Sequence, residues 1–252
     1  FVKYTAQKLA DLKKISYDTT VLIEKPISND LQSARDFCAV CKRSGADVAV
    51  DYPRRAVPAY QRLRRILSEG RLGELINVTV DAYGAVSMNG SHFLDLVQFL
   101  TDIQPVEVRA TFRDGVATHH RGSQYSDSYG EVVIGGKDQL QITLNMQEPG
   151  VTRDHQMSIF GTQGKVSVKE KSGIVKFENS REEKIQFVSS VDDWIFDYLH
   201  GVLRGDSYIC RPEEASQSLQ ILAAAFASHR MAGQVVPLPL VGAEANAKLR
   251  IA

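Results

Sequence analysis

The sequence predicts part of a parallel α/β domain, followed by an α+β domain with a large, mainly antiparallel sheet. Two observations carry this prediction. Thr20–Ile23 and Val48–Val50 are short apolar runs on either side of a helical pattern, which makes a strand-helix-strand unit with parallel strands. From Val106 to Val188 the pattern changes to short strands joined by turn residues, which favours antiparallel pairing.

The helix of the first unit begins after Pro26, because proline cannot continue a central strand. Asn29 can cap this helix with Gln32 three residues later, and apolar residues recur at helical spacing up to Gly45. The spacing of apolar residues then predicts a helix from Tyr60 to near Gly70, a strand over Leu75–Tyr83 and a helix from Ser91 to about Leu100.

The second half of the chain is mostly strand. Strands are predicted at Gly130–Ile134, Gln139–Asn145, His155–Phe160, Lys165–Val168 and Ile174–Phe177. Two helices follow, one over about Val191–Leu203 and one that begins at Pro212, which suits a first helical turn, and ends near Met231. The small, polar residues after Val241 are expected to be peripheral. We therefore divide the chain into residues 1–52, 53–240 and a tail of residues 241–252.

Composition narrows the range of partners. The 252 residues include 30 basic and 30 acidic residues, which indicates neither nucleic acid nor an anionic membrane as a partner. No apolar run approaches the roughly 18 residues of a membrane span, and no signal-peptide pattern is present, so we expect a cytoplasmic protein. Cys38 and Cys41 lie inside a predicted helix, which favours buried thiols over a redox pair, and no metal site is expected.

The first candidate site is Glu24-Lys25-Pro26, at the carboxyl end of the first strand. Ligands bind at this edge of open α/β sheets. A lysine that is partly desolvated there can act as an acid or a base. The alternative is an ordinary strand end with solvated charges.

The second candidate site is the segment from Asn89 to Asp95. Asn89 or Ser91 can cap the helix that follows, and His92 falls in its first turn, where the helix dipole disfavours a charged imidazole. A neutral imidazole can accept a proton. Asp95 lies on the same helix face and could orient the ring. The alternative is a capped helix with a structural histidine.

Other candidates are less specific. Arg54 and Arg55 follow the second strand and could hold a phosphate or a carboxylate, or could form interdomain ion pairs. Tyr125, Asp127 and Tyr129 could line a polyol pocket. Residues 161–164 read as a hairpin turn, and the sequence contains no G-x-G-x-x-G, P-loop or G-x-S-x-G motif.

Taken in order, these segments resemble the Gfo/Idh/MocA oxidoreductases, which include glucose-fructose oxidoreductase and inositol dehydrogenase. The resemblance runs from about residue 20 to residue 240. Its matching segments are VLIEKP (21–26), VAVDYPRRAVPA (48–59), GRLGEL (70–75), NGSHFLDL (89–96) and IFGTQGKVSV (159–168).

The resemblance implies an NAD(P)-binding Rossmann domain, of which residues 1–52 are a C-terminal part. It also implies a substrate domain whose antiparallel sheet makes homo-oligomer contacts. The activity it implies is hydride transfer between the nicotinamide and an alcohol carbon of a sugar, sugar nucleotide or cyclic polyol, with NAD or NADP as cofactor. The site residues it implies are Lys25 and His92 for catalysis, Asn89, Asp95 and Tyr125 for substrate, and Glu24, Lys25, Pro26 and Arg55 for cofactor.

Two departures from the family pattern leave alternatives open. Met88 stands where the family has an acid, so Lys25 and His92 would carry the proton transfer. The 23 residues before Glu24 are too few for the two βαβ units, of about 30 residues each, that include the glycine-rich turn. A non-catalytic ligand-binding or regulatory protein on the same fold, or an inactive fragment, is therefore the alternative.

Overall fold

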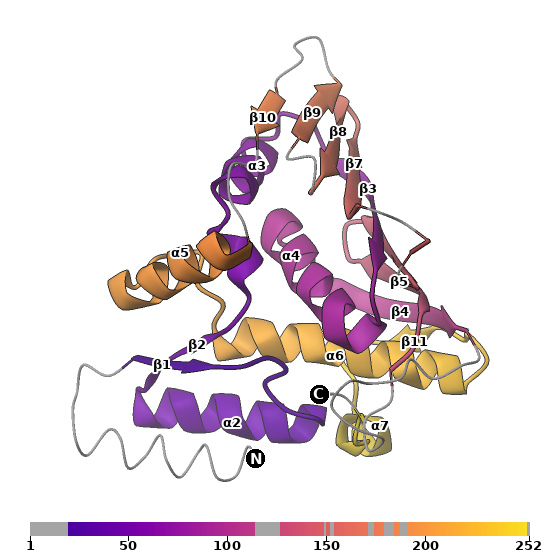
Figure 1. Ribbon diagram of the computed structural model, residues 1–252. Helices are drawn as coiled ribbons and strands as arrows, with labels where there is room; N and C mark the ends of the chain where they lie inside the picture. The colour runs from indigo at the N-terminus through magenta and orange to yellow at the C-terminus, as the bar shows by residue number, and fades with distance from the viewer. Residues whose placement is uncertain are drawn as a thin grey trace.

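The computed structural model describes residues 20–113, 127–148, 150–151, 154–170, 174–178, 184–186 and 191–250, and within them the strands form two sheets. The small sheet pairs β1 (Thr20–Ile23) with β2 (Asp47–Val50) in parallel, and α2 (Leu31–Ser44) connects the two strands. This confirms the predicted strand-helix-strand unit (Figure 1).

Both ends of α2 show why the helix occupies these residues. The Asp30 carboxylate accepts a hydrogen bond from the Ser33 backbone N–H at 2.7 Å, so the cap is Asp30 and the predicted cap, Asn29, is wrong by one residue. At the other end Gly45 adopts a left-handed conformation with φ of 60°, which glycine reaches without steric cost.

The large sheet has nine strands in the order β10-β9-β8-β7-β3-β6-β5-β4-β11. Only the pair β3–β6 is parallel among these neighbours, so the predicted large, mainly antiparallel sheet is confirmed. The strands are β3 (Leu75–Tyr83), β4 (Pro105–Phe112), β5 (Gly130–Gly136), β6 (Gln141–Gln147), β7 (Gln156–Gly161), β8 (Gly164–Lys169), β9 (Ile174–Glu178), β10 (Lys184–Gln186) and β11 (Val236–Pro237).

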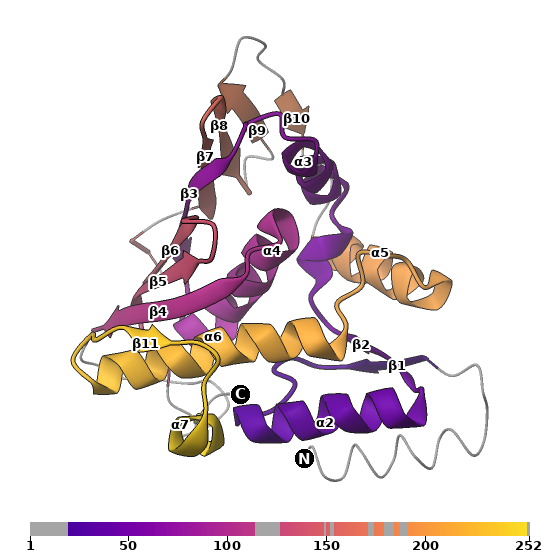
Figure 2. The same ribbon diagram turned by 180° about the vertical axis from the view of Figure 1, so that it is seen from behind.

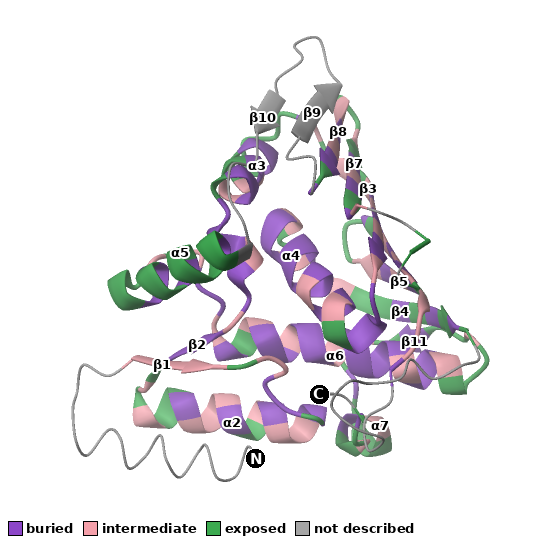
Figure 3. Cartoon of the chain, in the orientation of Figure 1, coloured by how far each residue is buried: buried purple, intermediate pink, exposed green. Residues whose placement is uncertain are grey.

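Helices join the two sheets through a shared apolar core. α4 packs against β3 and β6, and α6 contacts α2, α4 and β4, so it lies between the small sheet's helix and the large sheet (Figures 1 and 2). Figure 3 shows α4 and α6 mostly buried, whereas α5 exposes its outer face. These helices and short turns are η1 (Pro53–Ala56), α3 (Pro58–Ser68), η2 (Val86–Gly90), α4 (Ser91–Thr101), α5 (Val191–Arg204), α6 (Pro212–Arg230) and α7 (Gly242–Asn246).

Most of residues 241–250 are exposed, as expected, but two residues of this tail pack against the rest of the fold. α7 contacts α2 and α6, and Ala245 and Leu249 are buried. The Leu249 backbone N–H donates to the Asn29 carbonyl at 2.7 Å, which ties the end of the chain to the loop before α2. Among the described helices, none combines the length and the apolar character needed to cross a membrane. The domain boundaries and the oligomer contacts of the large sheet stay predictions.

Candidate active site

The candidate site begins where β1 and β2 end side by side. Ile23 pairs with Val50, and the Asp51 backbone N–H donates to the Ile23 carbonyl at 2.9 Å. The Tyr198 hydroxyl of α5 donates to the Val50 carbonyl and fixes the end of β2. The two strands therefore release Glu24 and Asp51 at the same edge of the small sheet, with Lys25 next along the chain.

Lys25 connects this edge to the start of α4. Its Nζ donates to the Met88 carbonyl at 2.6 Å, and it lies 3.4 Å from the Ser91 hydroxyl oxygen. Lys25 and Met88 are 63 residues apart in the sequence. The first two candidate clusters of the sequence thus meet at one place, which neither sequence pattern alone required.

His92 lies in the first turn of α4, half-buried, with its ring edge-to-face against Tyr52 at a centroid distance of 5.6 Å. Its Nδ1 atom is buried and has no hydrogen-bond partner among the residues that the structure describes. Burial, together with the positive charges of Lys25 and Arg54, holds the pKa of His92 well below its usual value. The imidazole is therefore neutral at neutral pH and can accept a hydrogen bond.

The turn before α4 has its own anchor. The buried Asp127 carboxylate accepts hydrogen bonds from the backbone N–H groups of Ser87 and Met88 at 2.9 Å each and from the Ser87 hydroxyl. These bonds hold the π-helical turn η2, which presents the Met88 carbonyl to Lys25. Asp127 therefore positions the turn, and its expected place in a polyol pocket is wrong. Tyr125 lies outside the described residues.

Asn89 is half-buried at the same turn. Its Nδ2 donates to the Tyr83 carbonyl at 2.6 Å, and it does not cap α4, whose N-cap is Gly90. Gly84 makes this contact possible, because it has a φ of 103° and a Cβ there would lie 2.9 Å from the Asn89 Cβ. The proposed substrate contact of Asn89 stays a prediction.

Arg55 and Asp95 form a buried ion pair away from the His92 ring. The guanidinium donates to both Asp95 oxygens, at 2.8 and 2.7 Å, and to Glu214 at 2.7 Å. The side chains of Arg55 and Asp95 are 2% and 1% exposed. Asp95 therefore does not orient His92. The two groups are buried against each other, and the predicted contacts of Arg55 with cofactor and of Asp95 with substrate stay predictions.

A second polar network lies beside the site, and it gives Arg54 an ion-pair partner that the sequence did not identify. Arg54 donates to both carboxylate oxygens of Glu170, at 2.8 and 3.2 Å, and its guanidinium lies 4.5 Å from the centre of the Phe93 ring. His155 stacks on Tyr83 at 4.2 Å. Glu170 is 116 residues from Arg54 in the sequence. The sequence therefore indicated only that Glu170 is a charged residue at the end of a strand, and did not indicate its partner. This network joins η1 to the ends of β7 and β8.

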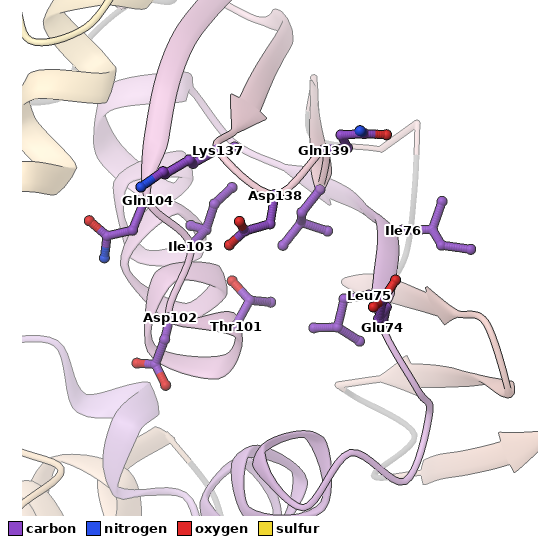
Figure 4. A pocket seen from close by; sticks show the side chains of 12 residues that line it. Glu74, Leu75, Ile76, Thr101, Asp102, Ile103, Gln104, Lys137, Asp138 and Gln139 are labelled. Carbon is purple, nitrogen blue, oxygen red and sulfur yellow. The ribbon is translucent and has the colours of Figure 1, made fainter.

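A large pocket lies elsewhere, at the C-terminal end of α4 (Figure 4). Its volume is about 770 Å³. It is lined by residues 74–76 at the start of β3, residues 101–104 after α4 and residues 136–140 of the β5–β6 hairpin. None of the sequence-predicted site residues lines it, so we place the candidate active site at the other end of α4, around Lys25 and His92.

Comparison with known proteins agrees with the motifs, although no protein-family model matches the chain. The chain is 23% identical over 209 residues to inositol 2-dehydrogenase of Rhizobium meliloti, which covers 77% of this chain and 59% of the relative. It is 24% identical over 173 residues to D-xylose 1-dehydrogenase [NADP(+)] of Haloarcula marismortui, covering 60% of this chain and 47% of the relative. The chain thus spans about half the length of the curated relatives it matches.

Solved structures share the fold at low sequence identity. The WlbA dehydrogenase of Bordetella pertussis, in complex with NADH and UDP-GlcNAcA, has a TM-score of 0.68 and 20% identity, over 94% of this chain and 76% of that one. A super-repressor mutant of Gal80p from Saccharomyces cerevisiae has a TM-score of 0.77 and 11% identity, over 92% of this chain and 75% of that one. Both an enzyme and a repressor therefore use this fold.

Proposed function

We propose that this chain is part of an NAD(P)-dependent oxidoreductase, because it has the motifs and the fold of the Gfo/Idh/MocA oxidoreductases. It transfers hydride between the nicotinamide and an alcohol carbon of a sugar, sugar nucleotide or cyclic polyol. The observation that carries this proposal is the meeting of Lys25 and His92 at the carboxyl edge of the small parallel sheet, through the bond from Lys25 Nζ to the Met88 carbonyl. The names of the relatives, which include a polyol and a sugar dehydrogenase, support the substrate class.

The residues at this edge fit the nicotinamide end of such a cofactor. Two parallel strands end there, a lysine and two carboxylates project from the edge, and a buried imidazole nitrogen of His92 is left for a further hydrogen bond. Glu24, Lys25 and Pro26 would contact the bound cofactor. When bound, NAD(P) supplies the acceptor or donor of the hydride.

The chain's own residues handle the proton and hold the alcohol. The Lys25 ammonium, fixed by the Met88 carbonyl, can donate a hydrogen bond to the substrate oxygen and stabilise the negative charge that develops on it. His92 is neutral and can accept a hydrogen bond or a proton at its free nitrogen. Asp127 keeps the turn that carries Met88 in place, so it acts by positioning Lys25.

Cofactor binding and turnover test this function directly. Protein expressed from the complete reading frame is titrated with NADH and NADPH, and binding is followed by nicotinamide fluorescence. Oxidation of a panel of cyclic polyols, aldoses and sugar nucleotides is then followed at the nicotinamide absorbance. We expect saturable binding of one cofactor and turnover with at least one member of the panel. Absence of both would overturn the proposal.

The second candidate is a regulatory, ligand-binding protein on the same fold. Met88 favours it, because a thioether cannot accept a proton or bind a hydroxyl as a carboxylate does. The similarity in fold to a super-repressor mutant of Gal80p also supports a regulatory protein as a candidate. Saturable binding of NAD(P)H without turnover of any alcohol would favour this candidate over the dehydrogenase.

A further inference from the structure

The hydroxyl of Ser91 is a group at the site that the mechanism above does not use. Ser91 is the first residue of α4, and it is 3% exposed. The sequence allowed Ser91 to cap this helix, but the N-cap is Gly90 and no side chain makes the capping hydrogen bond. The hydroxyl instead contacts Lys25 and the turn before the helix.

Three polar atoms form a closed triangle at this point. Lys25 Nζ donates to the Met88 carbonyl at 2.6 Å and to the Ser91 hydroxyl oxygen at 3.4 Å. The Ser91 hydroxyl donates to the same Met88 carbonyl at 3.2 Å. Because the hydroxyl proton is directed to the carbonyl, a lone pair of the hydroxyl oxygen is left to accept from the ammonium. The hydrogen bond that the hydroxyl donates also makes it a better acceptor.

These two acceptors belong to two different elements of the fold. Met88 lies on η2, which the Asp127 carboxylate holds through the Met88 backbone N–H. Ser91 begins α4, whose apolar side chains are buried in the core. A lysine side chain has four rotatable bonds, so a single hydrogen bond lets its ammonium swing about the acceptor. Hydrogen bonds to two elements fix its position.

The contact with Ser91 also sets where Lys25 lies relative to His92. Ser91 and His92 are consecutive residues in the first turn of α4, so the contact joins the ammonium to the element that carries the imidazole. A serine hydroxyl that bonds a carbonyl three residues earlier is common in helices, and by itself it shows only a structural role. The contact with a lysine 66 residues away gives Ser91 a place at the site.

We propose that Ser91 is a positioning residue for Lys25, whose ammonium it holds where that group can donate to the oxygen of the reacting alcohol. The proposal rests on the dehydrogenase function. Ser91 acts through Lys25 and does not touch the substrate in this role. The negative charge that Lys25 stabilises develops on the substrate oxygen during the reaction, so the loss of Ser91 should lower kcat more than it raises KM.

The first experiment measures kcat and KM in Ser91→Ala, Ser91→Thr and Ser218→Ala. Ser218 is the matched control, because its buried hydroxyl also donates to a carbonyl one turn back, that of Glu214, and accepts from Gln98 Nε2 at 2.7 Å. We expect kcat to fall by about three- to tenfold in Ser91→Ala, with KM and cofactor affinity within about twofold of the parent. Ser91→Thr keeps the hydroxyl and should restore kcat, and Ser218→Ala should keep kcat.

The second experiment follows the ammonium protons of Lys25 by nitrogen-15 NMR, in the complete protein without cofactor. The signal is assigned by its loss in Lys25→Gln, and its exchange with water is measured at low temperature and slightly acidic pH. We expect exchange to be at least about threefold faster in Ser91→Ala than in the parent, because one acceptor is lost. Ser218→Ala should leave the exchange rate unchanged, since a general loss of packing does not act on Lys25.

The two experiments separate this proposal from the proposed function. Absence of turnover on any alcohol would overturn the dehydrogenase function, and the role of Ser91 in turnover with it, whatever the exchange rates show. An active enzyme with equal kcat in Ser91→Ala and the parent, or with equal exchange at Lys25, would overturn the role of Ser91 alone. A loss of kcat in Ser218→Ala as large as in Ser91→Ala would assign both losses to weaker packing, and would also overturn it.

Discussion

His92 and Asp95 lie three residues apart on α4, and the structure puts them in two different environments. His92 sits in the first turn, half-buried, with an unpaired Nδ1 within the described residues and with Lys25 and Tyr52 nearby. Asp95 is 1% exposed and holds Arg55 through two short hydrogen bonds. His92 can therefore accept one more hydrogen bond, whereas both oxygens of Asp95 already have partners.

On this one helix, the position of His92 is suited to a role in the reaction, whereas the position of Asp95 is suited to stabilising the fold. Arg55 lies in η1, Asp95 in α4 and Glu214 in α6, so their ion network ties three elements together. The His92 end of α4 instead meets the loop after β1, where the chain is partly exposed. We therefore expect substitutions at the ion network to change stability, and substitutions at Lys25 and His92 to change turnover.

The largest expected effect is on stability, in Arg55→Met. Removing the guanidinium leaves the Asp95 carboxylate buried without its partner, which should lower the free energy of unfolding by about 3–5 kcal/mol. Urea denaturation followed by circular dichroism measures this. Arg64→Ala is the control, because Arg64 and Asp102 form an ion pair with side chains 34% and 68% exposed and should contribute under about 1 kcal/mol. Similar losses in both variants would contradict the distinction.

Asp127→Ala should give the next largest effect. The substitution removes the charged acceptor of the Ser87 and Met88 N–H groups, and we expect a loss of about 1.5–3 kcal/mol in the free energy of unfolding. Ser87→Ala, which deletes one donor and keeps the carboxylate, should lose roughly 1 kcal/mol. If the turn does position Lys25, kcat should fall in Asp127→Ala as well; unaltered kcat would leave Asp127 with a purely structural role.

Lys25→Ala and His92→Ala should affect turnover more than stability. Each removes a proton-handling group, so kcat should fall by at least roughly tenfold, whereas the urea midpoint should move less than in Arg55→Met. Lys42→Ala, at an exposed position in the last turn of α2, serves as the control and should keep full turnover. Full turnover in both site variants would place the chemistry elsewhere.

The pH dependence of stability gives a smaller effect with a definite sign. The pKa of His92 is lower in the folded protein than its ordinary value of 6.5, so below pH 6.5 the unfolded chain binds more protons than the folded one. Stability should therefore decline as the pH falls from 6.5. His92→Gln should remove up to about 1 kcal/mol of this decline between pH 6.5 and 5.5.

The same contrast shows how far the sequence could be interpreted. Apolar spacing was enough to predict β1, α2 and β2 and the switch to a large antiparallel sheet, because these depend on local periodicity. The spacing of His92 and Asp95 placed both on one helix face. It could not predict that the Asp95 carboxylate would bind Arg55 instead of the His92 imidazole. Partners such as Glu170 for Arg54 are set by tertiary packing, which leaves no mark in a local pattern.

The smallest expected effect concerns the two cysteines of α2. Burial and the charge of Glu213 raise the pKa of Cys38 to about 12 and that of Cys41 to about 11, so neither is a thiolate at neutral pH. Iodoacetamide at pH 7.5 should alkylate them slowly in the folded protein and rapidly in urea, as counted by mass spectrometry. Cys38→Ser should leave kcat unchanged, because α2 supplies none of the groups around Lys25 and His92. Rapid alkylation of the folded protein would show that this face of α2 opens to solvent. It would then contradict the distinction between a tightly packed α2 and an accessible site around Lys25 and His92.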